Sequence, residues 1–170
     1  MNEYFRKREQ IKVEIDIVKA DIIQKALDIL NKMAEARYDG ENAKYVNNMQ
    51  PEVDFEQDAA IIDGFYEDGL VRIMNRIEPY VEDVEEISPY DFGTTLHLSF
   101  PENWKQKFEG VLRKRIEDYL VYMIIAHWLE KVSISDTQYS MEKADNLLYE
   151  VRHTCDMRQG AVHHTWNTTY

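Results

Sequence analysis

Glu150 and His153 are the two side chains whose types and spacing come closest to a metal site, because together they form a Glu-x-x-His motif. Residues three apart on a helix share a face, so a carboxylate and an imidazole could hold one ion. Di-iron sites in helical bundles need two such motifs and a further glutamate from each of two other helices. The chain offers one motif, and His127 and Glu130 repeat its spacing in reverse order. We therefore expect an ordinary exposed helix face at Glu150 and His153, and neither a metal nor another cofactor.

Other residues that could support catalysis lack the partners that such chemistry needs. Cys155 has no nearby base except His153, and two residues so close on a helix point in different directions. As a single cysteine it forms no internal disulfide, which agrees with a reducing compartment. Gly64 and Gly69 follow no strand and precede no Lys-Ser/Thr pair, so they predict no phosphate-binding loop. The sequence therefore predicts a protein that is not an enzyme.

The last eleven residues, 160–170, have no hydrophobic period and predict an extended tail. Trp166 and Tyr170 are large aromatics in a polar terminus, and such residues often anchor one protein in a pocket of another. We expect them to bind a partner, together with His163 and His164. The alternative is that the tail packs onto the protein's own helices.

The net charge of −12 comes almost entirely from the middle of the chain. Residues 41–92 contain 14 acids and only three bases, Lys44, Arg72 and Arg76. Such a surface repels phosphates, so sequence-specific binding to nucleic acid is not expected. A solvated acidic face that maintains solubility is the simplest interpretation.

Helical periodicity dominates the first half of the chain. Apolar residues recur three or four apart over residues 2–38, which predicts one long helix, with Gly40 as its stop. Residues 11–17 also alternate like a strand, but charged residues lie between and no turn signal flanks them, so we favour the helix. The polar residues 41–57 predict a connection, and a second helix begins near Asp58.

Residues 94–100 carry the clearest strand pattern in the chain, with Leu96 and Leu98 on one side and His97 on the polar side. A strand needs a partner for its backbone groups. Either residues 84–88 pair with it as a hairpin, or a neighbouring subunit supplies the partner. In the second case Leu96 and Leu98 belong to a partner-binding surface.

The second half of the chain predicts two more helices. Pro101 and Glu102 suit the first turn of one helix, and Ser135 or Asp136 the cap of the other. The fold class is therefore mainly α: a four-helix bundle-like domain over residues 1–159, with a short strand or hairpin and the tail 160–170. The apolar runs are too short to cross a membrane, and the N-terminus lacks the pattern of a secretory signal, so we expect an intracellular protein.

Four stretches of the sequence resemble a family of small proteins encoded in phages and prophages of the Bacteroidetes. They are ARYDGENAKYVNNMQ (Ala36 to Gln50), TTLHLSFPENW (Thr94 to Trp104), DYLVYMIIAHWL (Asp118 to Leu129) and YSMEKADNLLYEVR (Tyr139 to Arg152). These stretches are structural rather than catalytic, and no catalytic residues are carried over. The resemblance implies a head-tail connector: an adaptor or ring protein in the virion neck, assembled in the host cytoplasm, that joins the portal to the tail as a homo-oligomer, commonly of twelve copies.

A ring around passing DNA gives the acidic residues a use, because an acidic bore does not hold phosphates. The residues expected to face such a channel are Asp54, Glu56, Glu82, Asp83, Glu85 and Glu86. Two alternatives stay open: a non-virion acidic binding module, such as an assembly chaperone or a DNA-mimicking inhibitor, and a small helical enzyme or metal protein.

Overall fold

The computed structural model describes residues 10–38, 55–86, 93–130 and 134–159. This part of the chain is mainly helical, with four α-helices and a three-stranded antiparallel sheet, which confirms the predicted helical class. The elements in chain order are β1 (Gln10–Val18), α1 (Lys19–Tyr38), α3 (Phe55–Arg76), the 3-10 helix η1 (Glu78–Tyr80), β2 (Val81–Glu86), β3 (Gly93–Pro101), the 3-10 helix η2 (Gln106–Phe108), α4 (Glu109–Leu129) and α5 (Ile134–Asp156). None of the helices described here is both long and apolar enough to cross a membrane.

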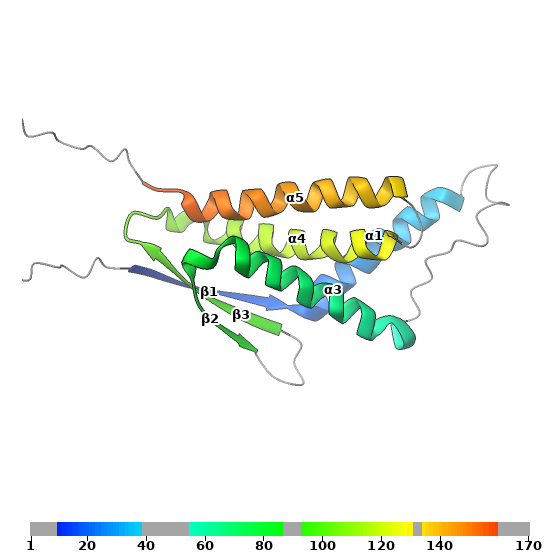
Figure 1. Ribbon diagram of the computed structural model, residues 1–170, viewed down its shortest axis with the longest axis horizontal. Coiled ribbons are helices and arrows are strands. Elements are labelled where there is room, and N and C mark those ends of the chain that lie inside the picture. The colour runs from blue at the N-terminus through cyan, green and yellow to red at the C-terminus, as the bar shows by residue number, and fades with distance from the viewer. Residues whose placement is uncertain (1–9, 39–54, 87–92, 131–133, 160–170) are drawn as a thin grey trace, which may run out of the picture.

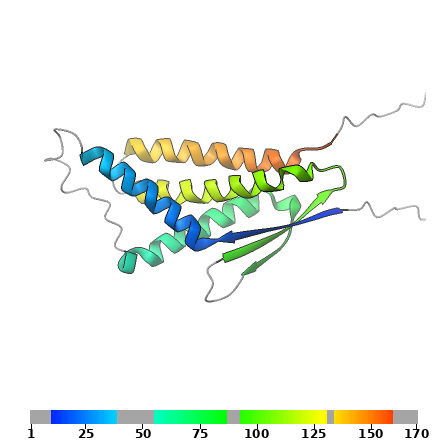
Figure 2. The same cartoon turned by 180° about the vertical axis from the view of Figure 1, so that it is seen from behind.

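The sheet has the strand order β1-β3-β2, so the last strand in the sequence lies in its centre. β1 pairs with β3 in unbroken register from Gln10 opposite Pro101 to Val18 opposite Gly93. The pairing of β2 with β3 is interrupted by a bulge between Val81 and Asp83. Helices cover one face of the sheet and leave the other open, as the two opposite views agree (Figures 1 and 2).

Helix α4 forms the centre of the hydrophobic core, and α1, α3 and α5 each pack against it (Figure 1). Its second half was predicted to be central because it is apolar nearly all round. The structure confirms this, since every residue from Tyr119 to Leu129 except Tyr122 and His127 is buried. Gly69 of α3 allows a close approach, because a Cβ at that position would lie 2.8 Å from Cδ2 of Leu120.

The prediction of one helix over residues 2–38 is wrong at its start, where residues 10–18 form β1. Val13, Ile15 and Ile17 are buried under the helices, while the charged residues between them point outward. Strand and helix follow one another directly at Lys19, so no glycine or proline marks the boundary. The alternation of residues 11–17 therefore indicated the secondary structure correctly. The absence of a flanking turn signal did not argue against a strand.

The strand predicted at residues 94–100 is confirmed as β3, and the hairpin with the preceding segment forms through β2. Because β1 occupies the other edge of β3, a neighbouring subunit cannot pair with this strand. Leu96 and Leu98 are only 0% and 1% exposed, since both face the helices. Their assignment as partner-binding residues is therefore wrong.

The connection from β3 to α4 is longer than predicted. Pro101 ends the strand instead of opening a helix, and α4 begins only at Glu109, after the turn η2. Trp104 lies in this connection rather than on a helix, yet it is fully buried. Pro79 lies just beyond the end of α3 at Arg76, in η1.

Candidate functional site

The open face of the sheet is lined by carboxylates from both of its edge strands. Alternation points the even-numbered residues of β1 away from the core, and β2 contributes acids from the opposite edge. We call this surface the acidic sheet face; its carboxylates are Glu14, Asp16, Glu82, Asp83 and Glu85. Three of the six acids expected from sequence to face a channel are therefore on one surface. A channel role for them stays a prediction.

His97 of the central strand lies between the two acidic edges. Its Nδ1 is 3.5 Å from Glu14 of β1, and its Nε2 is 3.4 Å from Glu85 of β2. This confirms the predicted place of His97 on the polar side of the strand. Lys12 pairs with Glu82 across the sheet, so one lysine and one histidine oppose five carboxylates. The face is strongly negative in consequence.

The remaining acids and the tail residues of the sequence prediction cannot be placed. Asp54 and the four tail residues lie outside the described residues, as do the side chains of Glu56 and Glu86. Those four residues are His163, His164, Trp166 and Tyr170.

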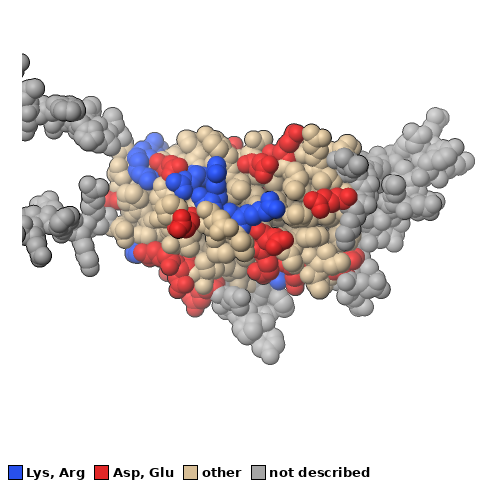
Figure 3. All heavy atoms as spheres, viewed as in Figure 1, with Lys and Arg blue, Asp and Glu red and all other residues tan. Residues whose placement is uncertain are grey.

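A second surface, between α3 and the end of α5, is rich in arginine. Figure 3 shows lysine and arginine side chains gathered on this side of the molecule, with aspartate and glutamate among them and along the lower border where the sheet lies. We call Arg72 and Arg76 of α3, Arg152 of α5 and Arg158, which follows α5, the arginine cluster. Arg72 and Arg76 are exposed, and neither guanidinium makes a hydrogen bond or ion pair with a described residue.

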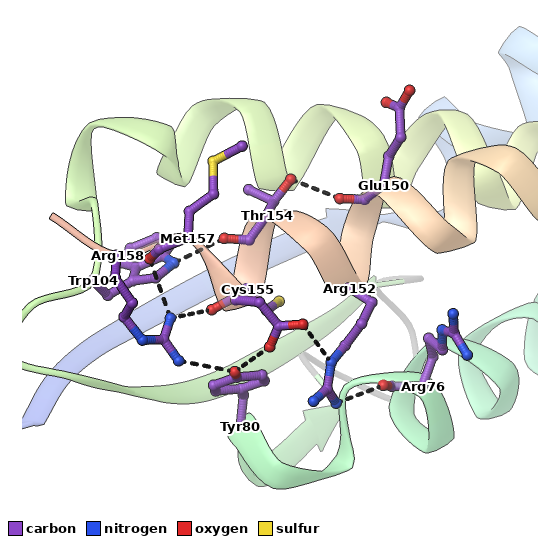
Figure 4. A network of polar contacts seen from close by, with 10 residues as sticks. Arg76, Tyr80, Trp104, Glu150, Arg152, Thr154, Cys155, Met157 and Arg158 are labelled. Atoms are coloured by element: carbon purple, nitrogen blue, oxygen red, sulfur yellow. Dashed lines mark hydrogen bonds and ion pairs between the residues drawn. The ribbon is translucent and has the colours of Figure 1, made fainter. Parts of the chain in front are cut away.

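The other two arginines are held in place around Tyr80 (Figure 4). The Tyr80 hydroxyl donates to Asp156 Oδ1 at 2.5 Å and accepts from Arg158 Nη2 at 3.0 Å. Arg152 Nε pairs with Asp156 Oδ2 at 3.0 Å. Both guanidinium groups lie over the Tyr80 ring, 5.3 Å and 5.8 Å from its centroid. Arg152 also donates to the carbonyl of Arg76 at 3.1 Å, which ties α5 to the end of α3.

This network shifts the protonation of its members. Burial opposes ionisation of Asp156, but hydrogen bonds from Tyr80 and Arg152 and the charges of Arg152 and Arg158 outweigh it, so the pKa of Asp156 is lowered. Burial and the hydrogen bond to Asp156 raise the pKa of the Tyr80 phenol. Asp156 is therefore ionised at neutral pH, where it pairs with Arg152 and accepts the hydrogen bond of Tyr80.

Trp104 fastens the end of α5 to the sheet. Its indole stacks on Phe100 with ring centroids 4.1 Å apart, and Nε1 donates to the carbonyl of Thr154 at 3.0 Å. Beyond the helix, the amide of Gln159 donates to the carbonyl of Asn103 at 2.6 Å. The described chain thus ends at a fixed point beside the turn that follows β3.

The residues considered for chemistry have other roles here. Glu150 pairs with Arg115 at 3.0 Å, and His153 stacks on Tyr149 on the exposed side of α5, as an ordinary helix face would. Cys155 is buried, and burial raises the pKa of its thiol to about 12. Within the described ranges, no group of three or more His, Cys, Asp or Glu side chains is arranged to hold a metal ion.

An open groove of about 440 Å³ lies between α1 and α5 and has α4 as its floor. Lysines and aspartates line it together, so its charge is mixed. Lys143 donates to the Tyr122 hydroxyl at 2.6 Å, and Lys25 pairs with Glu117 at 2.9 Å, so two of its lysines are already bound within the chain. We assign no ligand to it.

Sequence reasoning missed two of the five carboxylates of the acidic sheet face and the whole arginine cluster. Glu14 and Asp16 alternate with buried residues, and reading that alternation as a strand would have placed them on an outer face. The four-residue spacing of Arg72 and Arg76 puts both on one helix face, but their association with Arg152 and Arg158 depends on the tertiary fold.

The chain matches no protein-family model, and no curated protein or solved structure is significantly similar to it. The resemblance to phage connectors therefore rests on the sequence stretches quoted above.

Proposed function

We propose that this chain is the structural subunit of a head-tail connector in a tailed phage, a ring that joins portal to tail in the virion neck. Beyond the sequence resemblance, one observation carries the proposal: the acidic sheet face and the arginine cluster lie on different sides of a small domain whose helices pack against α4.

Symmetry explains why two such surfaces favour a ring. In a two-fold dimer both copies contribute the same surface to the contact, so two patches on different sides of the domain cannot both lie in it, and a dimer through the acidic sheet face alone would bring carboxylates together. A head-to-tail contact instead brings the acidic surface of one copy to the arginines of the next. Contacts of this type close into rings when the rotation between subunits allows it.

The charge of the chain also suits DNA as passing cargo rather than as a ligand. Each subunit has a net charge of −12, so an assembled ring repels phosphates and its non-specific retention of DNA is weak. Assembly takes place in the bacterial cytoplasm, and the neighbours of the ring are the portal and the tail proteins.

The main alternative is a non-virion acidic module, such as an assembly chaperone or a DNA-mimicking inhibitor. The observation that favours it is the acidic sheet face itself, which presents carboxylates in two rows separated by the central strand. Such a module would act as a monomer or dimer and would bind a basic protein. Its binding would be lost when the carboxylates are replaced by lysine.

The test is the oligomeric state of the full chain, alone and with the purified portal. Multi-angle light scattering and negative-stain microscopy should find closed rings, formed by the protein itself or on the portal. Monomers under both conditions would overturn the proposal. Retention on a column of basic proteins, without ring formation, would instead support the acidic module.

A further inference from the structure

We propose that neighbouring subunits of the ring join through the acidic sheet face of one copy and the arginine cluster of the next. The inference rests on the proposed function, because it names the contact that closes the ring. It also assigns Glu82, Asp83 and Glu85 to the interface between subunits instead of to the DNA channel.

The acidic side of this contact is accessible. The side chains of Glu14 and Glu85 are each 72% exposed. They lie on the two edge strands of one sheet rather than on loops, so their spacing is fixed before a partner arrives. Val18, which is 48% exposed at the end of β1, adds an apolar element at the rim of this face.

The basic side is accessible at Arg72 and Arg76. Arg72 and Arg76 lie one helical turn apart on α3 with guanidinium groups that make no described hydrogen bond or ion pair. Arg152 and Arg158 are oriented by Tyr80 and Asp156, so this half of the cluster is preorganised. Val71 is 49% exposed beside the first pair and provides an apolar counterpart to Val18.

Guanidinium and carboxylate groups suit such a contact because they form paired, directional hydrogen bonds. Charge complementarity mainly determines which surfaces meet and how fast they associate, whereas affinity needs apolar burial as well. The overall charge of −12 opposes association between copies. The local attraction decides the outcome at contact distance, since charges farther apart than about 8–10 Å are screened at physiological salt.

Two charge-reversal variants test the contact. Arg72→Glu with Arg76→Glu cancels the positive charge of the arginine cluster, and Glu14→Lys with Glu85→Lys cancels the negative charge of the acidic sheet face. None of these four side chains contributes to the core, and the Tyr80 network stays intact in both proteins. Each variant alone should lose the ring, with at least a tenfold weaker association measured by light scattering.

An equimolar mixture of the two variants should restore rings, because the introduced lysines of one variant then meet the introduced glutamates of the other, and each unchanged arginine cluster meets an unchanged acidic sheet face. Two controls change the charge equally at other exposed sites: Lys32→Glu with Lys107→Glu, and Glu130→Lys with Glu142→Lys. Both controls should assemble like the unmodified protein, and circular dichroism should give all variants the same helix content.

The outcomes separate this inference from the proposed function. If the unmodified chain forms rings and the two variants do so as well, or if the mixture of variants stays unassembled, the subunit contact is elsewhere and the connector function stands. If the unmodified chain forms no ring even with the portal, both proposals fail.

Discussion

The hydroxyl of Tyr80 and the carboxylate of Asp156 meet at 2.5 Å and join η1 to the last turn of α5. Around this contact Arg152 and Arg158 lie over the Tyr80 ring, and the ring itself packs against Phe100 with centroids 5.1 Å apart. Tyr80 thus connects the core of the sheet to the arginine cluster.

Replacing Tyr80 by phenylalanine should remove this hydrogen bond and keep the packing. We expect the free energy of unfolding in urea to fall by about 1.5–3 kcal/mol, the usual range for a hydrogen bond to a charged group. Tyr149→Phe is the matched control, because Tyr149 is 63% exposed and its loss should leave stability unchanged. Equal effects of the two substitutions would contradict the structural role given to Tyr80.

Asp156 should contribute to stability only when it is ionised. Its pKa is lowered in the folded protein, so its contribution is fully present above the ordinary value of 3.8 and is lost as the pH falls through the lower folded value. The melting temperatures of the native protein and of Asp156→Asn should therefore differ at pH 7 and converge below pH 3.8. A difference that stays constant across this range would show that the carboxylate is not the group involved.

Two glycines of α3 should respond in opposite ways to alanine. At Gly64 a Cβ meets nothing within 4 Å, so alanine should stabilise the helix by about 0.5–1 kcal/mol. At Gly69 it would lie 2.8 Å from the buried Leu120, and the cost of about 1–3 kcal/mol for overpacking exceeds the helix gain. Thermal unfolding should place Gly64→Ala above the native protein and Gly69→Ala below it; the reverse order would mean that α3 and α4 are farther apart.

The thiol of Cys155 should be inert while the protein is folded. It is buried and its pKa is raised to about 12, so almost no thiolate forms at pH 8. A disulfide reagent such as DTNB should react within minutes in 8 M urea and at least a hundredfold more slowly without it. Because the chain has one cysteine, the signal needs no correction. Rapid reaction of the native protein would show that this end of α5 opens readily.

The helices after residue 55 could be predicted because their apolar residues repeat with a helical period and Pro79 marks a boundary. The first strand could not, because Ile15, Val18, Ile22 and Ala26 keep helical spacing across the junction of β1 and α1. The local sequence pattern cannot decide whether these residues form a strand or a helix. They form a strand because β3, far along the sequence, supplies the hydrogen-bond partners of β1.

The candidate site shows the same limit of sequence reasoning. The acids of β2 could be recognised as a cluster because they lie close together in sequence. Glu14 and Asp16 join them on the same face only because β1 and β2 both pair with β3. Arg152 and Arg158 join Arg72 and Arg76 through the contact of α5 with α3. Neither association is encoded in spacing along the chain.

The central position of β3 also affects how the protein folds. β1 is made early during synthesis. Even its paired residues that lie nearest in sequence, Val18 and Gly93, are separated by a segment that includes α1, α3, η1 and β2. Closing so long a loop is slow and entropically costly, and an unpaired strand attracts other strands in the meantime. The alternating charges of Lys12, Glu14 and Asp16 limit this risk, because charged residues on a waiting strand discourage pairing between chains. The same acids that we assign to assembly of the folded protein thus protect the nascent chain from assembling too soon.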